Sequence, residues 1–154
     1  MGKVVVVSAV HIGVIFCLIH AAILPASMAQ VSLTSSVQQA GRQAACPGET
    51  VTFTCNVLDD VALQWIAGNQ IPSSDPISFR PNSQTVNISR GSFTATLVSS
   101  IRNPSNVWRA RFHSQLTVTV GEDNSLNGTQ VTCNRRSMDL IVSCKLKYLS
   151  ACIM

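Results

Sequence analysis

Cysteine is the residue type with the most chemistry to offer in this chain. Six cysteines occur among its 154 residues: Cys17, Cys46, Cys55, Cys133, Cys144 and Cys152. In an oxidising compartment such residues form disulfides, whereas in a reducing one they more often bind metals or act in catalysis. The cellular compartment therefore decides how these cysteines are interpreted.

The first 29 residues have the order of a secretory signal peptide. After Lys3, residues 4–24 carry no charged side chain, and the small residues Ser27 and Ala29 suit a cleavage site. We expect a helical leader over residues 1–29, cleavage after Ala29 and secretion. The alternative is a retained membrane anchor, since residues 4–24 are just long enough to span a bilayer.

Loss of the leader changes the cysteine count and the charge. Without Cys17 five cysteines are left, an odd number, and we interpret them as disulfide partners rather than metal ligands, with no metal or other cofactor. The odd thiol is free, bonds to a second chain, or lies in a poorly folded tail. Eleven Lys and Arg, less Lys3, against seven acidic residues leave a net charge of +3, which is too mild to indicate a nucleic-acid partner.

Catalysis has few candidate residues. His113 is the one histidine after the leader, and it falls on the polar side of an alternating segment, where no nucleophile or acid is expected to meet it. With Arg109 and Arg111 it forms a stripe at strand spacing, interpreted as solubilising charge, with an acidic protein surface or a sulfated glycan as the alternative partner. The chain is not expected to be an enzyme.

Three short motifs point outward from the predicted core. Arg135 and Arg136 occupy a predicted turn, and turns at the end of a sheet structure are frequent contact sites, so this pair is a candidate for partner binding. Asn87-Ile88-Ser89 and Asn127-Gly128-Thr129 satisfy the N-glycosylation pattern, which makes Asn87 and Asn127 candidate glycan sites.

The elements that position these residues are predicted to be strands. Residues 50–57 alternate polar and apolar, which places Val51, Phe53, Cys55 and Val57 on one face. By the same alternation, three further sets of side chains are predicted to face the core: Val61, Leu63 and Trp65; Thr129, Val131 and Cys133; and the long run Ala110, Phe112, Ser114, Leu116, Val118 and Val120. Trp65 and Leu116 are therefore predicted core residues.

Weaker signals complete the domain, which is long enough for one core. Residues 30–45 predict an edge strand, residues 71–92 predict edge strands and loops because they contain three prolines, and residues 93–98 predict a strand. Asn103-Pro104-Ser105-Asn106 predicts a turn, and Met138, Leu140 and Val142 predict a last strand after a short hairpin.

Two inward cysteines on separate strands, with Trp65 on a third, resemble an immunoglobulin-like domain of the variable-like set. The resemblance covers about residues 31–149 and implies an all-β antiparallel sandwich with Greek-key connections at 30–149, followed by a short tail at 150–154. It implies a disulfide between Cys55 and Cys133 with Trp65 covering it. Another β-sandwich with an independent disulfide is the alternative fold.

Two positions depart from the family pattern. Val131 stands where a tyrosine is usual two residues before the second cysteine, and Asn127 stands where an acidic residue is usual. The corner before this strand must therefore be held in another way. Because the first strand of such sandwiches can switch sheets to lie beside the last, Cys46 and Cys144 are candidates for a second disulfide, which would leave Cys152 for a homo-oligomer contact. The alternative is that they do not pair, which leaves three thiols to scramble and a loosely held tail.

The resemblance implies extracellular recognition or adhesion, with a protein ligand or receptor as partner. One alternative is that the chain is a truncated first domain of a cell-surface receptor, in which case a membrane is involved. A secreted enzyme or carbohydrate-binding module is a further alternative, and it needs convergent polar groups in a pocket.

Overall fold

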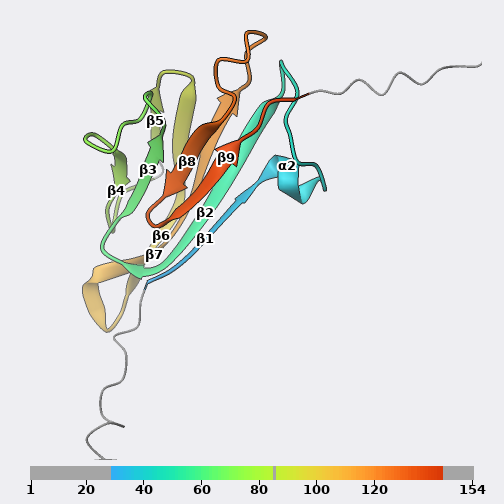
Figure 1. Cartoon of the computed structure of the whole chain (residues 1–154). Helices are drawn as coiled ribbons and strands as arrows, with labels where there is room; N and C mark the ends of the chain where they lie inside the picture. The colour runs from blue at the N-terminus through green and yellow to red at the C-terminus, as the bar shows by residue number, and fades with distance from the viewer. Residues whose placement is uncertain (1–28, 85, 144–154) are drawn as a thin grey trace, which may run out of the picture.

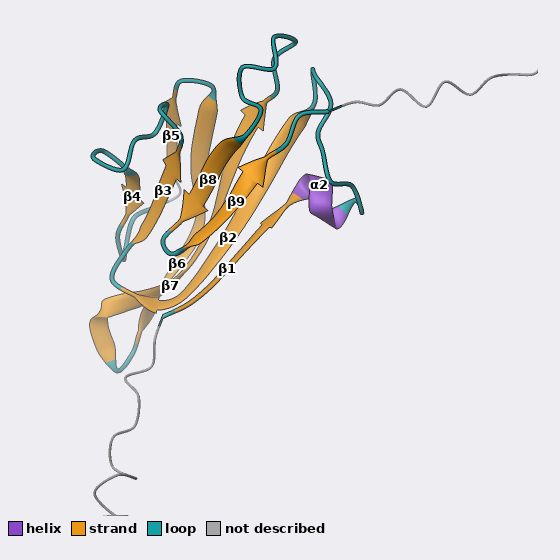
Figure 2. Ribbon diagram, viewed as in Figure 1, coloured by secondary structure: helices purple, strands orange, loops and turns teal. Residues whose placement is uncertain are grey.

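A computed structural model describes residues 29–84 and 86–143. The expected leader, apart from Ala29, lies outside the described residues, as do Cys144, Cys152 and the tail at 150–154. The described chain folds into two antiparallel sheets packed face to face (Figures 1 and 2). The predicted all-β sandwich is confirmed.

One sheet has five strands and the other has four. The five-stranded sheet has, in spatial order, β1 (Gln30–Ser35), β2 (Thr50–Asp60), β7 (Asn106–Thr119), β6 (Phe93–Asn103) and β5 (Asn87–Arg90). The four-stranded sheet has β4 (Ile77–Phe79), β3 (Leu63–Ala67), β8 (Thr129–Cys133) and β9 (Arg136–Leu140). The proline-containing segment supplies β4 and β5, which both lie at sheet edges as expected.

Alternation along the strands decides which side chains enter the core. Val51, Phe53, Cys55 and Val57 of β2 are buried, and so are all six inward residues predicted from Ala110 to Val120. β2 pairs with β7 so that Phe53 lies opposite Leu116, and opposite residues of an antiparallel pair point to the same face. The predicted core positions Trp65 and Leu116 are both fully buried.

The disulfide joins the two sheets through the middle of this core. Cys55 of β2 and Cys133 of β8 are bonded, with Cα atoms 6.4 Å apart. Trp65 lies directly opposite Cys133 on the neighbouring strand β3. Its indole Nε1 donates a 2.9 Å hydrogen bond to Ser114 Oγ, and that hydroxyl donates to the Thr96 carbonyl at 2.8 Å. The tryptophan is therefore buried with its polar atom satisfied, as buried tryptophans require.

The segment from β1 to Ala45 passes from one sheet to the other. β1 pairs with β2 at the edge of the five-stranded sheet, but Ala45 forms a parallel bridge with Val142 beside β9. Ala45 N donates to the Ile141 carbonyl at 2.9 Å, and Ser143 N donates to the Ala45 carbonyl at 3.0 Å. Cys46 is itself disulfide-bonded. Its bond to Cys144 stays a prediction, because Cys144 lies outside the described residues.

Two local expectations are wrong. The edge strand expected over residues 30–45 ends at Ser35, whose hydroxyl accepts a hydrogen bond from Gln38 N and begins the short helix α2 (Ser36–Gln39). Val61 was expected to face inward with Leu63, but it is 56% exposed. It lies in the two-residue connection between β2 and β3, where strand alternation no longer applies. No helix among the described residues has the length and hydropathy to cross a membrane.

Candidate interaction site

The β6–β7 hairpin is longer than the sheet it faces. β7 has 14 residues and β6 has 11, whereas β3, in the opposite sheet, has five. In Figure 1 the tan end of this hairpin extends beyond the other strands at the lower end of the molecule. Within the described residues, no strand of the second sheet lies over the inner face of the hairpin end (Figure 1).

The inward row of β7 continues into this overhang. Trp108 has the same parity as Ala110 and Phe112, which are buried, yet Trp108 itself is 77% exposed. On β6 Arg102 lies opposite Ala110, so its side chain leaves the hairpin from the same face. A tryptophan and an arginine thus occupy positions that would be core positions if β3 began earlier.

A groove of about 470 Å³ lies between this overhang and the end of the four-stranded sheet. Val107 and Trp108 line it on the hairpin side, and Val61 and Pro81 line it on the other. Val61 and Val107 are 56% and 54% exposed. Contiguous exposed apolar side chains on a small domain indicate an interaction surface more often than chance exposure.

The charged groups that line the groove are both guanidinium groups. Arg80 and Arg102 line it together with Gln64. Within the described residues the ion pairs are Arg42–Glu49, Arg90–Asp75 and Arg109–Asp59, so neither groove arginine takes part in one. A smaller hollow of about 230 Å³ shares Val61, Ala62 and Gln64 with the groove, and Asp60 and Arg135 line it with one charge of each sign. The charged groups of the groove itself are therefore positive, whereas those of the adjoining hollow are mixed.

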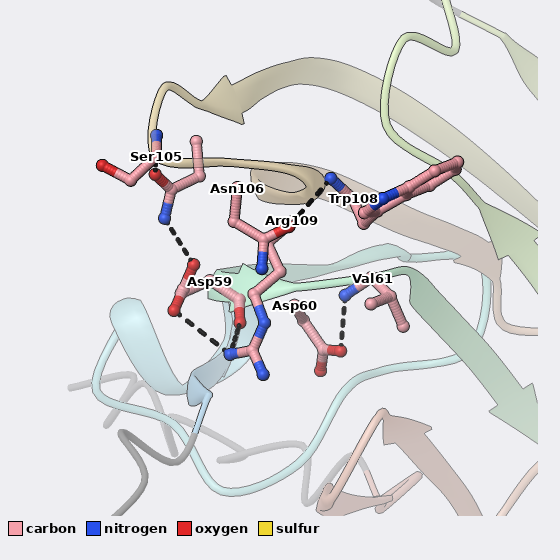
Figure 3. A network of polar contacts seen from close by, with 8 residues as sticks. Asp59, Asp60, Val61, Ser105, Asn106, Trp108 and Arg109 are labelled. Carbon is pink, nitrogen blue, oxygen red and sulfur yellow. Dashed lines mark hydrogen bonds and ion pairs between the residues drawn. The ribbon is translucent and has the colours of Figure 1, made fainter.

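A polar network centred on Asp59 holds the turn end of the hairpin. The Asp59 carboxylate accepts hydrogen bonds from Asn103 Nδ2 at 2.7 Å and from Arg109 Nη1 at 3.2 Å. Arg109 also donates to the Asp59 carbonyl at 3.2 Å, and Asn103 Oδ1 accepts from Ser105 N at 2.8 Å. Figure 3 shows these contacts, with Trp108 extending away from them. The hairpin end is thus tied to the end of β2.

The same end of β2 is tied to the β8–β9 turn. The Asp60 carboxylate accepts from Val61 N at 2.7 Å and from Asn134 Nδ2 at 3.1 Å. Asn134 also donates to the Ala62 carbonyl and accepts from Gln64 N, at 3.0 and 2.7 Å. The connections after β2, β6 and β8 therefore form one hydrogen-bonded end of the sandwich.

The basic residues that the sequence singled out do not form one surface in the structure. Arg135 lies in the turn between β8 and β9 and Arg136 begins β9, and both are exposed where they border the first residues of β1. The predicted stripe is divided: Arg109 bonds to Asp59, and His113 lies 2.6 Å from Asn56 Oδ1 through its Nδ1. Arg111 is exposed and enters none of the ion pairs of the described chain.

Both glycosylation motifs lie at the surface. Asn87 begins the edge strand β5 and is exposed, and Asn127 is exposed in the connection before β8. Asn127 Oδ1 accepts a 2.8 Å hydrogen bond from Val142 N, while Val131 is fully buried. The corner that lacks the expected tyrosine is therefore held by an asparagine side chain bonded to the segment after β9.

The shifted titratable groups lie away from the hairpin end. A hydrogen bond from Arg42 and one from the Cys46 backbone lower the pKa of Glu49, which precedes β2. The pKa of Asp123 is lowered by hydrogen bonds from the backbone and side chain of Ser125. Among residues 29–84 and 86–143, no three His, Cys, Asp or Glu side chains are grouped to hold a metal ion.

The sequence interpretation missed Trp108, Arg102 and Arg80. The parity of Trp108 with Ala110 was available, and so was the length of the alternating segment compared with the short run at Leu63. The parity indicates an inward-facing tryptophan, but where β3 begins, and hence that Trp108 stays exposed, is known only from the structure. Comparison of the chain with models of protein families, with curated proteins and with solved structures found no match.

Proposed function

We propose that this chain is an extracellular recognition module of the immunoglobulin type that binds a protein partner through the end of the sandwich at the β6–β7 hairpin. The observation that carries the proposal is the exposed inward face of the hairpin, with Trp108 77% exposed in a core row of β7. Tryptophan is enriched at the centres of protein interfaces because it buries a large area with little loss of conformational freedom.

The strand order supports the immunoglobulin assignment. The run β1-β2-β7-β6 has the order A-B-E-D of such a sandwich, and β3-β8-β9 has the order C-F-G, with β4 as an added strand of the variable type. The disulfide from β2 to β8 and the tryptophan on β3 take the positions that the family uses. β5 departs from the variable type because it extends the sheet of β6.

The position of the connections supports binding at this end. In variable-type domains the connections between B and C and between F and G lie at the recognition end. Here these are the β2–β3 connection, which holds Val61, and the β8–β9 turn, which holds Arg135, and both border the groove or its adjoining hollow. The secretory order of residues 1–29 and the disulfide support an oxidising, extracellular location.

The test is capture of partners from extracellular and cell-surface material by the secreted protein. Three forms are compared: the native chain, Trp108→Ser, and Ile141→Ser, which changes an exposed apolar residue at the far end of β9. We expect the native chain and the Ile141 variant to retain the same protein, and the Trp108 variant to lose it. Equal retention by all three forms, or no specific protein with any, would contradict the proposal.

A further inference from the structure

The groove beside Trp108 has a composition that selects among classes of partner. Its lining joins apolar side chains, including Val61, Pro81 and Val107, to two guanidinium groups. Burying the apolar part yields about 25 cal/mol per Å² of surface removed from water, so a partner gains by filling it with an apolar side chain. A partner without such a side chain leaves that contribution unused.

The two guanidinium groups require anionic groups on the partner. Arg80 and Arg102 are exposed, and neither forms an ion pair with the described residues. A neutral partner covering them would take two charges out of water without compensation, which is costly. A partner with carboxylates placed beside its apolar side chain satisfies both requirements, and guanidinium groups suit bidentate pairing with carboxylates.

Two other occupants fit less well. A sulfated or sialylated glycan supplies anions for the two arginines, but it has no apolar side chain to fill the part of the groove that Val61, Pro81 and Val107 line. A second copy of this chain, docked by the usual two-fold symmetry, would set this patch with its two arginines against the identical patch of the first copy, whose described lining supplies no carboxylate. Both occupants leave part of the groove unmatched.

We propose that the groove formed by the β6–β7 overhang binds an acidic protein segment in which an apolar side chain is flanked by Asp or Glu. The apolar side chain packs against Trp108 and Val107, and the carboxylates meet Arg80 and Arg102. This inference rests on the proposed function, because it gives the partner of the same site its chemistry. The Asp59 network holds the hairpin end in place before binding, which lowers the ordering cost of association.

Synthetic peptides supply the probe. One series carries a central Leu or Tyr flanked by Asp and Glu, and a matched series replaces every acid with Asn or Gln. A heparin oligosaccharide serves as the glycan probe. Trp108 is the reporter, because the other tryptophan, Trp65, is fully buried. Its fluorescence emission should shift to the blue as a peptide covers the ring, and titration then gives the affinity of each peptide.

Four forms of the full chain are compared: native, Trp108→Ser, the double variant Arg80→Gln/Arg102→Gln, and Arg111→Gln as control. Arg111 lies opposite Ile101 on the outward face of the same hairpin. For the native chain and the control we expect acidic peptides to bind about tenfold more tightly than neutral ones at low salt, and this preference to fall as salt is added. The double variant should lose at least about fivefold of that preference. For the Trp108 variant, which lacks the reporter, binding is measured by calorimetry and should be abolished.

Three results would overturn the inference: equal affinity for acidic and neutral peptides, tighter binding of heparin than of any peptide, or an unchanged preference in the double variant. If a protein is still captured through Trp108 under these results, the recognition function stands and the acidic partner is wrong. If no protein is captured by any form, the recognition function itself is wrong. Circular dichroism of each variant separates these outcomes from loss of folding.

Discussion

The hydrogen bond between Trp65 and Ser114 gives a stability prediction that the core geometry makes quantitative. Both residues are fully buried, and the indole Nε1 donates to Ser114 Oγ at 2.9 Å. Ser114→Ala removes this acceptor and also the hydroxyl that donates to the Thr96 carbonyl at 2.8 Å. A buried donor left without an acceptor costs about 1–3 kcal/mol, and the second bond contributes about 1 kcal/mol, so we expect a loss near 3 kcal/mol.

A double-mutant cycle isolates the tryptophan's share of this loss. In a Trp65→Phe background no indole N–H is present, so Ser114→Ala should cost only about 1 kcal/mol there, a coupling of about 2 kcal/mol. Thr117→Val is the matched control, because its hydroxyl donates to the Thr94 carbonyl at 3.2 Å and accepts from no buried side chain that the structure describes.

Guanidinium denaturation followed by far-ultraviolet circular dichroism measures the free energy of unfolding of all variants. The reasoning is refuted if Ser114→Ala costs the same in both backgrounds. It is refuted equally if Ser114→Ala costs no more than Thr117→Val, since the orphaned indole would then contribute nothing.

Three further predictions follow from individual contacts. Replacing both Cys55 and Cys133 by Ala should lower the free energy of unfolding by about 4 kcal/mol, because the bond closes a loop with a sequence separation of 78 residues, and denaturation tests it. Asp59→Ala should cost about 1–2 kcal/mol, since its ion pair is half exposed, and should speed amide exchange at 105–108; unchanged exchange there would contradict the role of the network. Glu49→Gln should cost less than about 1 kcal/mol at pH 7 because it removes the Arg42 contact. The folded pKa of Glu49 lies below its ordinary 4.5. The stability that the Glu49 carboxylate contributes is therefore present above pH 4.5 and is lost as the pH falls through the lowered pKa. The free energies of unfolding of the native chain and the variant, plotted against pH, should converge in acid.

The core could be read from the sequence because one side of each central strand is buried wherever the opposite sheet covers it. In β7 the alternation from Ala110 to Val120 holds without exception, since β2 and β6 flank the strand and the second sheet covers its inner face. The turn at Asn103-Pro104 is predictable because its causes are local: proline restricts its own φ, and the Asn103 side chain accepts a hydrogen bond from Ser105 N two residues on.

The candidate site could not be read in the same way, because it depends on the relative lengths of strands in different sheets. Trp108 keeps the inward parity of β7, but only the position of β3 determines that its side chain stays 77% exposed. A register shift between Leu97 and Ser99 on β6 then decides that Arg102, rather than its neighbour Ile101, faces the groove. Bulges of this kind change which face a side chain occupies and leave no clear signal in the sequence.

Photo-crosslinking tests most directly whether the hairpin end is the recognition surface. A photoreactive amino acid is placed at Val107, in the groove, or at Ile141, at the far end of β9, and the secreted protein is illuminated with cells or extracellular material. We predict one protein partner crosslinked from position 107 and none from position 141. Crosslinking of the same partner from position 141 but not from position 107 would contradict the assignment of the binding site.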